Sequence, residues 1–228
     1  MVSSSLAHVN LALFDFDGTI TVTDSFAPFV SSTTERRRAR AGYALLFPIV
    51  VGYKLGIISA SSTRARICAV AFRGRREADV REAGSRYARD VLPTTLRTKA
   101  IDRIAWHKAQ GDTVVVVSAA LNVYLEPWCH SMDVDLVCTQ LEAVGGVLTG
   151  RYVGEDCVGS EKARRVTARY RLSDFSSVYA YGDTIEDEAM LSLAQHRYFR
   201  WRKTDLPIAR RRKADHVDES LHDVVEPL

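Results

Sequence analysis

The sequence lacks the features that mark several large classes of protein. Its four cysteines, Cys68, Cys129, Cys138 and Cys157, form no CxxC pair and have no histidine at metal-ligand spacing, which argues against a zinc site and a disulfide framework. The first ten residues contain neither a basic nor a long apolar stretch, so we expect no signal peptide and a cytoplasmic protein. A net charge of +3 over 228 residues gives no reason to expect a nucleic-acid partner. With 46% hydrophobic and 26% charged residues, the composition is that of a globular protein.

Four short apolar runs predict the strands of a sheet. They are Leu11–Phe16, Thr113–Val117, Val134–Cys138 and Val178–Tyr181. The second run is almost continuously β-branched, which is typical of a strand buried on both faces of a parallel sheet. Segments with helical spacing alternate with these runs, at Thr94–Gln110, Val123–Met132, Ser160–Tyr170 and Ile185–Ala194. This alternation predicts an α/β fold with a doubly wound parallel sheet.

Two stretches depart from the alternation. The pair Gly145–Gly146 separates two short strand-like pieces and predicts a hairpin over Leu141–Tyr152. Residues 25–97 contain no convincing strand and carry 14 Lys and Arg against 5 Asp and Glu, a net charge of +9. We therefore predict a core domain of residues 1–22 and 98–228, with a helical cap domain, residues 23–97, inserted after the first strand.

The predicted cap contains an apolar run, Ala41–Ile58, whose only charge is Lys54. The run is shorter than the roughly 20 apolar residues of a membrane span, and Pro48 interrupts it. We interpret it as a buried cap helix. The alternative is an element that rests on a membrane surface, so that the basic, apolar cap makes a peripheral membrane contact.

The most informative residues are the five of Asp15-Phe16-Asp17-Gly18-Thr19, at the end of the first predicted strand. Two carboxylates two positions apart on a strand project to the same side and repel each other unless a cation lies between them. Hard oxygen ligands of this kind favour Mg²⁺. Gly18 allows a tight turn whose amides can approach an anion.

Other strand ends supply complementary groups. The second strand is expected to end at Ser118, whose hydroxyl and following amides, beginning with Ala119, suit phosphate oxygens. The fourth run leads into an acidic turn that contains Asp183 and Asp187, and Lys162 begins the preceding helix. In open α/β sheets a ligand binds beyond the carboxyl ends of the strands. Carboxylates, a hydroxyl, amides and an ammonium at that edge together predict a phosphoryl-transfer site.

The order DFDGT, VVVVS, Lys162 and GDTIEDEAML resembles the four motifs of the haloacid dehalogenase-like phosphatases, and the resemblance extends from Leu11 to about Arg200. The helical insertion directly after the first motif is similar to the phosphoserine phosphatase-like branch. This resemblance implies a Mg²⁺-dependent phosphatase in which Asp15 is the nucleophile that forms an aspartyl-phosphate. Asp17 would act as general acid and then as general base.

The resemblance also implies roles for the remaining motif residues. The metal would be held by Asp15, the main-chain carbonyl of Asp17 and Asp183. The phosphoryl oxygens would be bound by Gly18, Ser118, Ala119 and Lys162, with Asp187 orienting Lys162 or a metal-bound water. Asp24, nine positions after the nucleophile, corresponds to the acid that meets the substrate amine in phosphoserine phosphatases.

Departures from the phosphoserine phosphatase pattern leave the substrate open. Ala119 and Ala120 replace two glycines, and Glu186 replaces a usual asparagine and brings negative charge close to the phosphate. We expect a small or amphiphilic phosphate ester as the substrate. The alternatives are a lipid phosphate such as phosphatidylglycerophosphate, histidinol phosphate or phosphoserine. From other classes, a phosphotransferase and a non-catalytic phosphate-binding module remain, and the sequence does not predict an oligomeric state.

Overall fold

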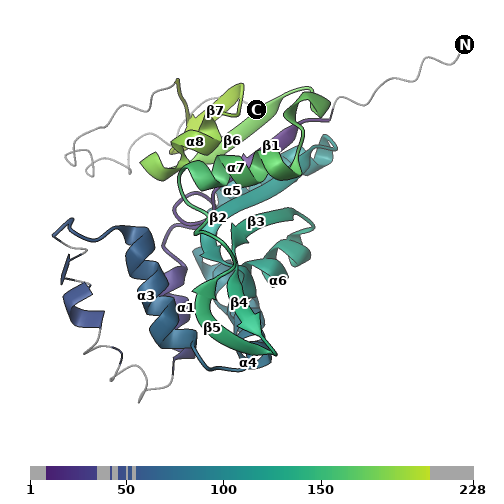
Figure 1. Ribbon diagram of the computed structural model, residues 1–228. Coiled ribbons are helices and arrows are strands. Elements are labelled where there is room, and N and C mark those ends of the chain that lie inside the picture. Colours follow the sequence, from purple (N-terminus) through teal and green to yellow (C-terminus); the bar gives the residue numbers. More distant parts are fainter. Residues whose placement is uncertain (1–8, 35–41, 43–45, 50, 53–54, 206–228) are drawn as a thin grey trace, which may run out of the picture.

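A six-stranded sheet forms the centre of the computed structural model, which describes residues 9–34, 42, 46–49, 51–52 and 55–205 (Figure 1). The strand order is β3-β2-β1-β6-β7-β8, and every neighbouring pair is parallel except β7 with β8. The strands are β1 (Leu11–Phe14), β2 (Thr113–Leu121), β3 (Asp135–Thr139), β6 (Val178–Gly182), β7 (His196–Phe199) and β8 (Arg202–Lys203). The predicted doubly wound parallel sheet is therefore confirmed.

Helices cover both faces of this sheet. They are α5 (Thr98–Ala109), α6 (Asn122–Met132), α7 (Ser160–Arg169) and α8 (Glu188–Leu191), with 3₁₀ turns η2 (Leu172–Asp174) and η3 (Ile185–Asp187). On one face, Ile104 of α5 and Leu125 of α6 pack with Phe14. On the other face, Val166 of α7 and Met190 of α8 pack with Leu13. Phe14 and Leu13 are adjacent in β1, so their side chains point to opposite faces, and burial of both explains the continuous apolar run.

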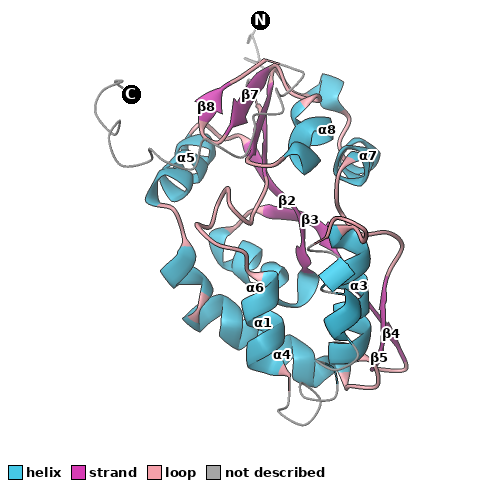
Figure 2. Cartoon of the chain, turned by 90° about the vertical axis from the view of Figure 1, so that its left-hand side faces the viewer, coloured by secondary structure: helices cyan, strands magenta, loops and turns pink. Residues whose placement is uncertain are grey.

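The described residues between β1 and α5 form a mainly helical part of the chain, called the helical segment below. It contains α1 (Phe26–Thr33), α3 (Ala60–Phe72), α4 (Glu77–Asp90) and the 3₁₀ turn η1 (Leu92–Thr95), which lie below the sheet in Figure 2. Helix α4 packs closely on the start of α6, where a Cβ on Gly84 would lie only 2.0 Å from the carbonyl oxygen of Val123. Only glycine allows two backbones to approach this closely.

The predicted hairpin is present as β4 (Leu141–Val144) and β5 (Val147–Tyr152). It pairs outside the central sheet and packs on α3, and the amide of Gly74 donates to the carbonyl of Leu148. The helical segment is thus attached to the rest of the chain through α4 on α6 and through α3 on β5. The division of the chain at residues 22 and 97 remains a prediction.

Two sequence expectations are wrong in detail. Strand β1 ends at Phe14, two residues earlier than expected, and β2 continues to Leu121 instead of ending at Ser118. The pairing of β2 with β3 shifts register between Ser118 and Leu121, so the two intervening alanines form a bulge. A bulge of this kind bends a strand and redirects its end, and bulges occur frequently beside active sites.

Part of the predicted apolar run Ala41–Ile58 lies outside the described residues, so its interpretation as a buried helix and the membrane alternative both stay predictions. Among the residues that the structure does describe, no helix combines the length and the apolar character that crossing a membrane requires.

Candidate active site

The predicted site residues come from four elements that meet at the carboxyl edge of the sheet. Asp15 follows β1 directly, Asp183 follows β6, and Asp187 ends the 3₁₀ turn η3. Lys162 lies in the first turn of α7, which covers one face of the sheet. Parallel strands place their carboxyl ends at one edge, and residues separated by more than 140 positions in the sequence therefore come together there.

A buried lysine joins two of these carboxylates. The Lys162 ammonium donates to Asp15 Oδ1 at 2.6 Å and to Asp187 Oδ1 at 2.5 Å. All three side chains are less than a tenth exposed. Burial by itself lowers the pKa of Lys162, but the charges of Asp15 and Asp187 outweigh it, and the pKa lies above its ordinary value. Lys162 is therefore a fixed positive charge beside Asp15.

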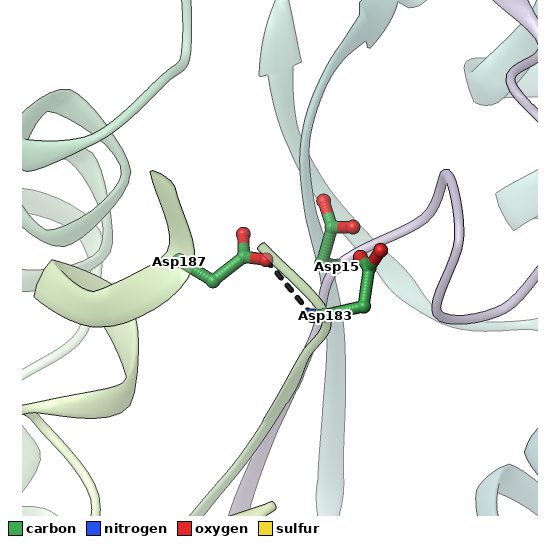
Figure 3. A group of neighbouring side chains, drawn as sticks. All are labelled: Asp15, Asp183 and Asp187. Atoms are coloured by element: carbon green, nitrogen blue, oxygen red, sulfur yellow. Dashed lines mark hydrogen bonds between the residues drawn. The ribbon is translucent and has the colours of Figure 1, made fainter. Parts of the chain in front are cut away.

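Three carboxylates form the acidic cluster: Asp15, Asp183 and Asp187 each offer an oxygen, and these oxygens lie within 4.8 Å of one another (Figure 3). The second oxygen of Asp187, Oδ2, accepts the amides of Asp183 and Thr184, both at 3.0 Å. Asp187 is thus fixed by the turn that carries Asp183, and its Oδ1 points to Lys162. With all three carboxylates ionised, one ammonium leaves the acidic cluster two negative charges in excess.

This excess of negative charge contributes to raised pKa values in the acidic cluster. Burial raises the pKa of Asp15 well above its ordinary value, the charge of Asp187 raises it further, and Lys162 only partly offsets the rise. Burial and Asp187 likewise raise the pKa of Asp183. In the protein alone, the pKa of Asp15 therefore lies above that of an ordinary carboxyl group. Three carboxylate oxygens at this separation suit a hard divalent cation, which would restore ionisation.

Gly18 is required where the loop after β1 passes Asp183. It has φ +82°, and a Cβ there would lie 2.3 Å from Asp183 Oδ2. The neighbouring Thr19 donates its hydroxyl to Asp183 Oδ1 at 3.1 Å. Thr19 was not among the predicted site residues, although it is part of the same motif.

Asp17 does not belong to the acidic cluster and contacts the helical segment instead. Its Oδ1 accepts the amide of Ser25 at 2.9 Å. Burial raises the pKa of Asp17 to about 7, the charge of Asp24 adds to the rise, and hydrogen bonding from Ser25 opposes it. A carboxyl group with this pKa can hold or release a proton near neutral pH.

Ser118 and Asp24 contact none of the carboxylates in the described structure by a hydrogen bond. Ser118 is buried within β2, and its hydroxyl accepts the amide of Ala120 at 3.1 Å, while Ala119 is half-buried at the bulge. Asp24 is exposed and accepts the amide of Ala27 at 3.0 Å, in the first turn of α1. Asp24 thus acts on the site through its charge on Asp17.

Comparison with known proteins identifies a family and several relatives of this chain. Residues 12–192 match the family of haloacid dehalogenase-like hydrolases. Protein CicA of Caulobacter vibrioides is 29% identical over 196 residues, covering 83% of this chain and 85% of that protein. A probable phosphatase of Mycobacterium tuberculosis is 29% identical over 195 residues, covering 81% of this chain and 66% of that protein.

Solved structures share the fold. A protein of unknown function from Bordetella pertussis superposes with a TM-score of 0.69 at 25% identity, covering 84% of this chain and 89% of that one. A substrate-bound phosphoserine phosphatase superposes with a TM-score of 0.60 at 19% identity, covering 84% and 85% of the two chains. Because the family match spans most of the sequence and includes all four motifs, this chain belongs to the haloacid dehalogenase-like hydrolases.

Proposed function

We propose that the protein is a Mg²⁺-dependent phosphatase that hydrolyses a phosphomonoester through an aspartyl-phosphate on Asp15. The observation that carries the proposal is the buried contact of Asp15 with Lys162, 2.6 Å away, inside a cluster of three carboxylates. A buried carboxylate beside a fixed cation, at the sheet edge where ligands bind, is suited to attack on an anionic phosphoryl group.

In the first step an oxygen of Asp15 attacks phosphorus and forms the new P–O bond. The bond to the leaving-group oxygen breaks, and that oxygen takes its electron pair and a proton from the carboxyl of Asp17. The pKa of Asp17, raised to about 7 by burial, supports this role because a sizeable fraction of the group is protonated near neutral pH. In the second step Asp17 accepts a proton from water, the water oxygen attacks phosphorus, and the bond to Asp15 breaks.

Electrostatic stabilisation would come from both signs of charge at the site. Lys162 faces the phosphoryl oxygens that carry charge during transfer, and Asp187 holds its ammonium in place. The residues that would hold Mg²⁺ are Asp15 and Asp183, with Asp187 and the carbonyl of Asp17 completing the candidate ligands. When bound, the ion would neutralise phosphoryl charge and keep Asp15 ionised.

The decisive experiment locates the phosphate. Enzyme mixed with a phosphomonoester and quenched in acid should carry one phosphate on the peptide that contains Asp15, and hydroxylamine should remove it. Asp15→Asn should abolish both the label and turnover. Asp17→Asn should slow turnover by about 10²–10⁴-fold, while an ester with a good leaving group still labels the protein. A phosphate on Ser118, or turnover by Asp15→Asn, would contradict the proposal.

A lipid phosphate is the second candidate substrate, and one observation favours it. Phe47, Leu55 and Ile57, in the described part of the apolar run, are 57%, 68% and 78% exposed. Apolar side chains in solvent within a basic segment suit an amphiphilic anion. Assays with glycerol phosphate and with lysophosphatidate in detergent separate the candidates, because only an amphiphile-specific enzyme prefers the second by more than about tenfold. Alcohol acceptors added to the same assay would reveal phosphotransfer.

A further inference from the structure

Ser25 occupies the position of a helix cap but does not cap its helix. It precedes α1, where a serine hydroxyl usually accepts an amide of the first turn. Here Asp24 accepts the amide of Ala27 instead. The Ser25 side chain makes no cap hydrogen bond. The hydroxyl of Ser25 lies 3.0 Å from the hydroxyl of Tyr124. The serine is therefore directed inward, toward Asp17.

Two tyrosines from different helices hold this serine. Tyr124 of α6 contacts its hydroxyl, and Tyr87 of α4 donates to its carbonyl oxygen at 3.1 Å. Ser25, Tyr87 and Tyr124 are at most 5% exposed. The Tyr87 and Tyr124 rings lie 5.5 Å apart, and Phe29 packs against both. The close approach of α4 to α6 at Gly84 brings the two tyrosines to the same point.

Burial of a hydroxyl group costs free energy unless the group has a hydrogen-bond partner. Here both tyrosine hydroxyls have Ser25 as their partner, and Ser25 contacts Asp17. The amide of Ser25 donates to Asp17 Oδ1. Hydrogen bonding from the side chain of Ser25, as well as from its amide, lowers the pKa of the Asp17 carboxyl. Ser25 therefore fixes the orientation of the Asp17 carboxyl group.

We propose that Ser25, Tyr124 and Tyr87 form a clamp that positions Asp17, so that its carboxyl group faces the leaving-group oxygen of the ester. This inference rests on the proposed function, in which Asp17 is the general acid. The three residues of the clamp touch neither substrate nor metal in this arrangement, so they are positioning residues. A displacement of an acid by about 1 Å can cost about 10²-fold in rate, so loss of one hydroxyl of the clamp should have a measurable effect.

The leaving group distinguishes positioning from simple structural support. An alkyl phosphate needs a proton on its leaving oxygen, whereas 4-nitrophenyl phosphate leaves as a stabilised anion. Loss of a positioned acid therefore slows the first ester much more than the second. A general distortion of the site slows both esters equally.

The experiment measures phosphorylation of the enzyme in a single turnover with glycerol phosphate and with 4-nitrophenyl phosphate. Tyr124→Phe should slow the reaction with glycerol phosphate about tenfold and that with 4-nitrophenyl phosphate less than about twofold. Ser25→Ala and Tyr87→Phe should change the ratio in the same direction. Tyr152→Phe is the matched control, because its hydroxyl contacts Cys68 Sγ at 3.4 Å instead of Ser25, and it should leave the ratio unchanged.

An equal loss with both esters, or no loss in a folded Tyr124→Phe, would overturn the clamp. If Tyr124→Phe does not fold, as judged by thermal unfolding, Tyr87→Phe and Ser25→Ala decide by the same ratio. A wild-type enzyme that is phosphorylated by neither ester, nor by lysophosphatidate in detergent, refutes the proposed function itself. That result is distinguishable from a failure of the clamp, which needs an active wild type.

Discussion

Two polar clusters adjoin the central sheet, the acidic cluster at its carboxyl edge and a histidine cluster beneath α5, and they differ in how completely their groups are paired. The histidine cluster consists of His107, Asp112, Tyr181 and Asn10. His107 Nδ1 lies 2.7 Å from Asp112 Oδ2, and its Nε2 lies 2.9 Å from the Tyr181 hydroxyl. Asn10 donates its amide and its side-chain Nδ2 to Asp112 Oδ1.

Because a carboxylate only accepts hydrogen bonds, Asp112 fixes the tautomer in which His107 Nδ1 donates and Nε2 accepts from Tyr181. Every polar side-chain atom of His107 then has a partner, and burial favours the neutral ring. The acidic cluster is the opposite case, since its three carboxylates share one ammonium. A cluster whose groups are all paired stabilises the fold, whereas the excess negative charge of the acidic cluster creates repulsion that a divalent cation can relieve.

The largest expected effect follows from relieving that repulsion by mutation. Asp183→Asn removes one charge from the acidic cluster and one candidate ligand of the metal. Activity should fall by at least about 100-fold, because a Lewis-acid contribution is worth several kcal/mol. The melting temperature, measured without divalent ions, should rise by about 2–4 °C, the equivalent of about 1 kcal/mol in a chain of this size.

The same variant tests the metal without an activity assay. Mg²⁺ should raise the melting temperature of the wild type, because a ligand that binds only the folded state stabilises it, by about 2.7 kcal/mol at 100 times its Kd. The rise should be much smaller in Asp183→Asn and unchanged in the surface control Asp174→Asn. Equal stabilisation of all three proteins would place the ion elsewhere.

The histidine cluster should respond in the reverse way. Asp112→Asn replaces one accepting oxygen with an NH2 donor, so either His107 Nδ1 or the two Asn10 donors lose their acceptor. We expect a loss of about 2–3 kcal/mol in the free energy of unfolding. The kcat of the folded enzyme should stay within about twofold of the wild type. Urea denaturation and steady-state kinetics measure the two quantities, and a large loss of kcat at full stability would link this cluster to catalysis.

Gly18 and Gly111 separate backbone strain from contact with the site. Both have positive φ, +82° and +78°, but only at Gly18 would a Cβ meet Asp183, while at Gly111 nothing lies within 4 Å. Gly18→Ala and Gly111→Ala should each lose about 1 kcal/mol of stability. Only Gly18→Ala should also lose activity, by about tenfold or more, because Asp183 must move. Equal activities would show that the loop tolerates the added methyl group.

The two clusters also show what the sequence can predict. The positions of Asp15, Asp183 and Lys162 at one sheet edge follow from alternating elements and from the rule that parallel strands end together. The histidine cluster was not predicted, because His107 and Tyr181 are 74 positions apart in the chain and no local pattern pairs them.

Other details depended on tertiary contacts that no short pattern encodes. The bulge at Ala119 and Ala120 reflects a shift in the register of β2 with β3 between Ser118 and Leu121. The hairpin was predicted from Gly145–Gly146, but its packing on α3 was not. Ser25 looks like an ordinary helix cap in the sequence, and only the arrangement of α4 and α6 shows that its hydroxyl turns toward Tyr124. The raised pKa of Asp15 likewise follows from burial.

The smallest expected effect is a pH dependence of stability from the histidine cluster. Burial lowers the pKa of His107 below its ordinary value of about 6.5, the hydrogen bond that His107 donates to Asp112 opposes this, and the net shift is downward. Below about pH 6.5 the unfolded chain then binds a proton at this histidine that the folded protein does not bind. The stability that the lowered pKa of His107 contributes is fully present above that pH, and it is lost as the pH falls further below that value. The free energy of unfolding should therefore decrease between pH 7 and pH 5 more steeply in the wild type than in His107→Gln, by up to about 1.4 kcal/mol for each pH unit. Urea denaturation at three pH values, with the mutant as the reference for all other titrating groups, measures the difference. Equal pH slopes of the free energy of unfolding in wild type and mutant would mean that His107 takes up its proton equally in the folded and unfolded states. The histidine cluster would then not keep His107 neutral, and the contrast with the acidic cluster would fail.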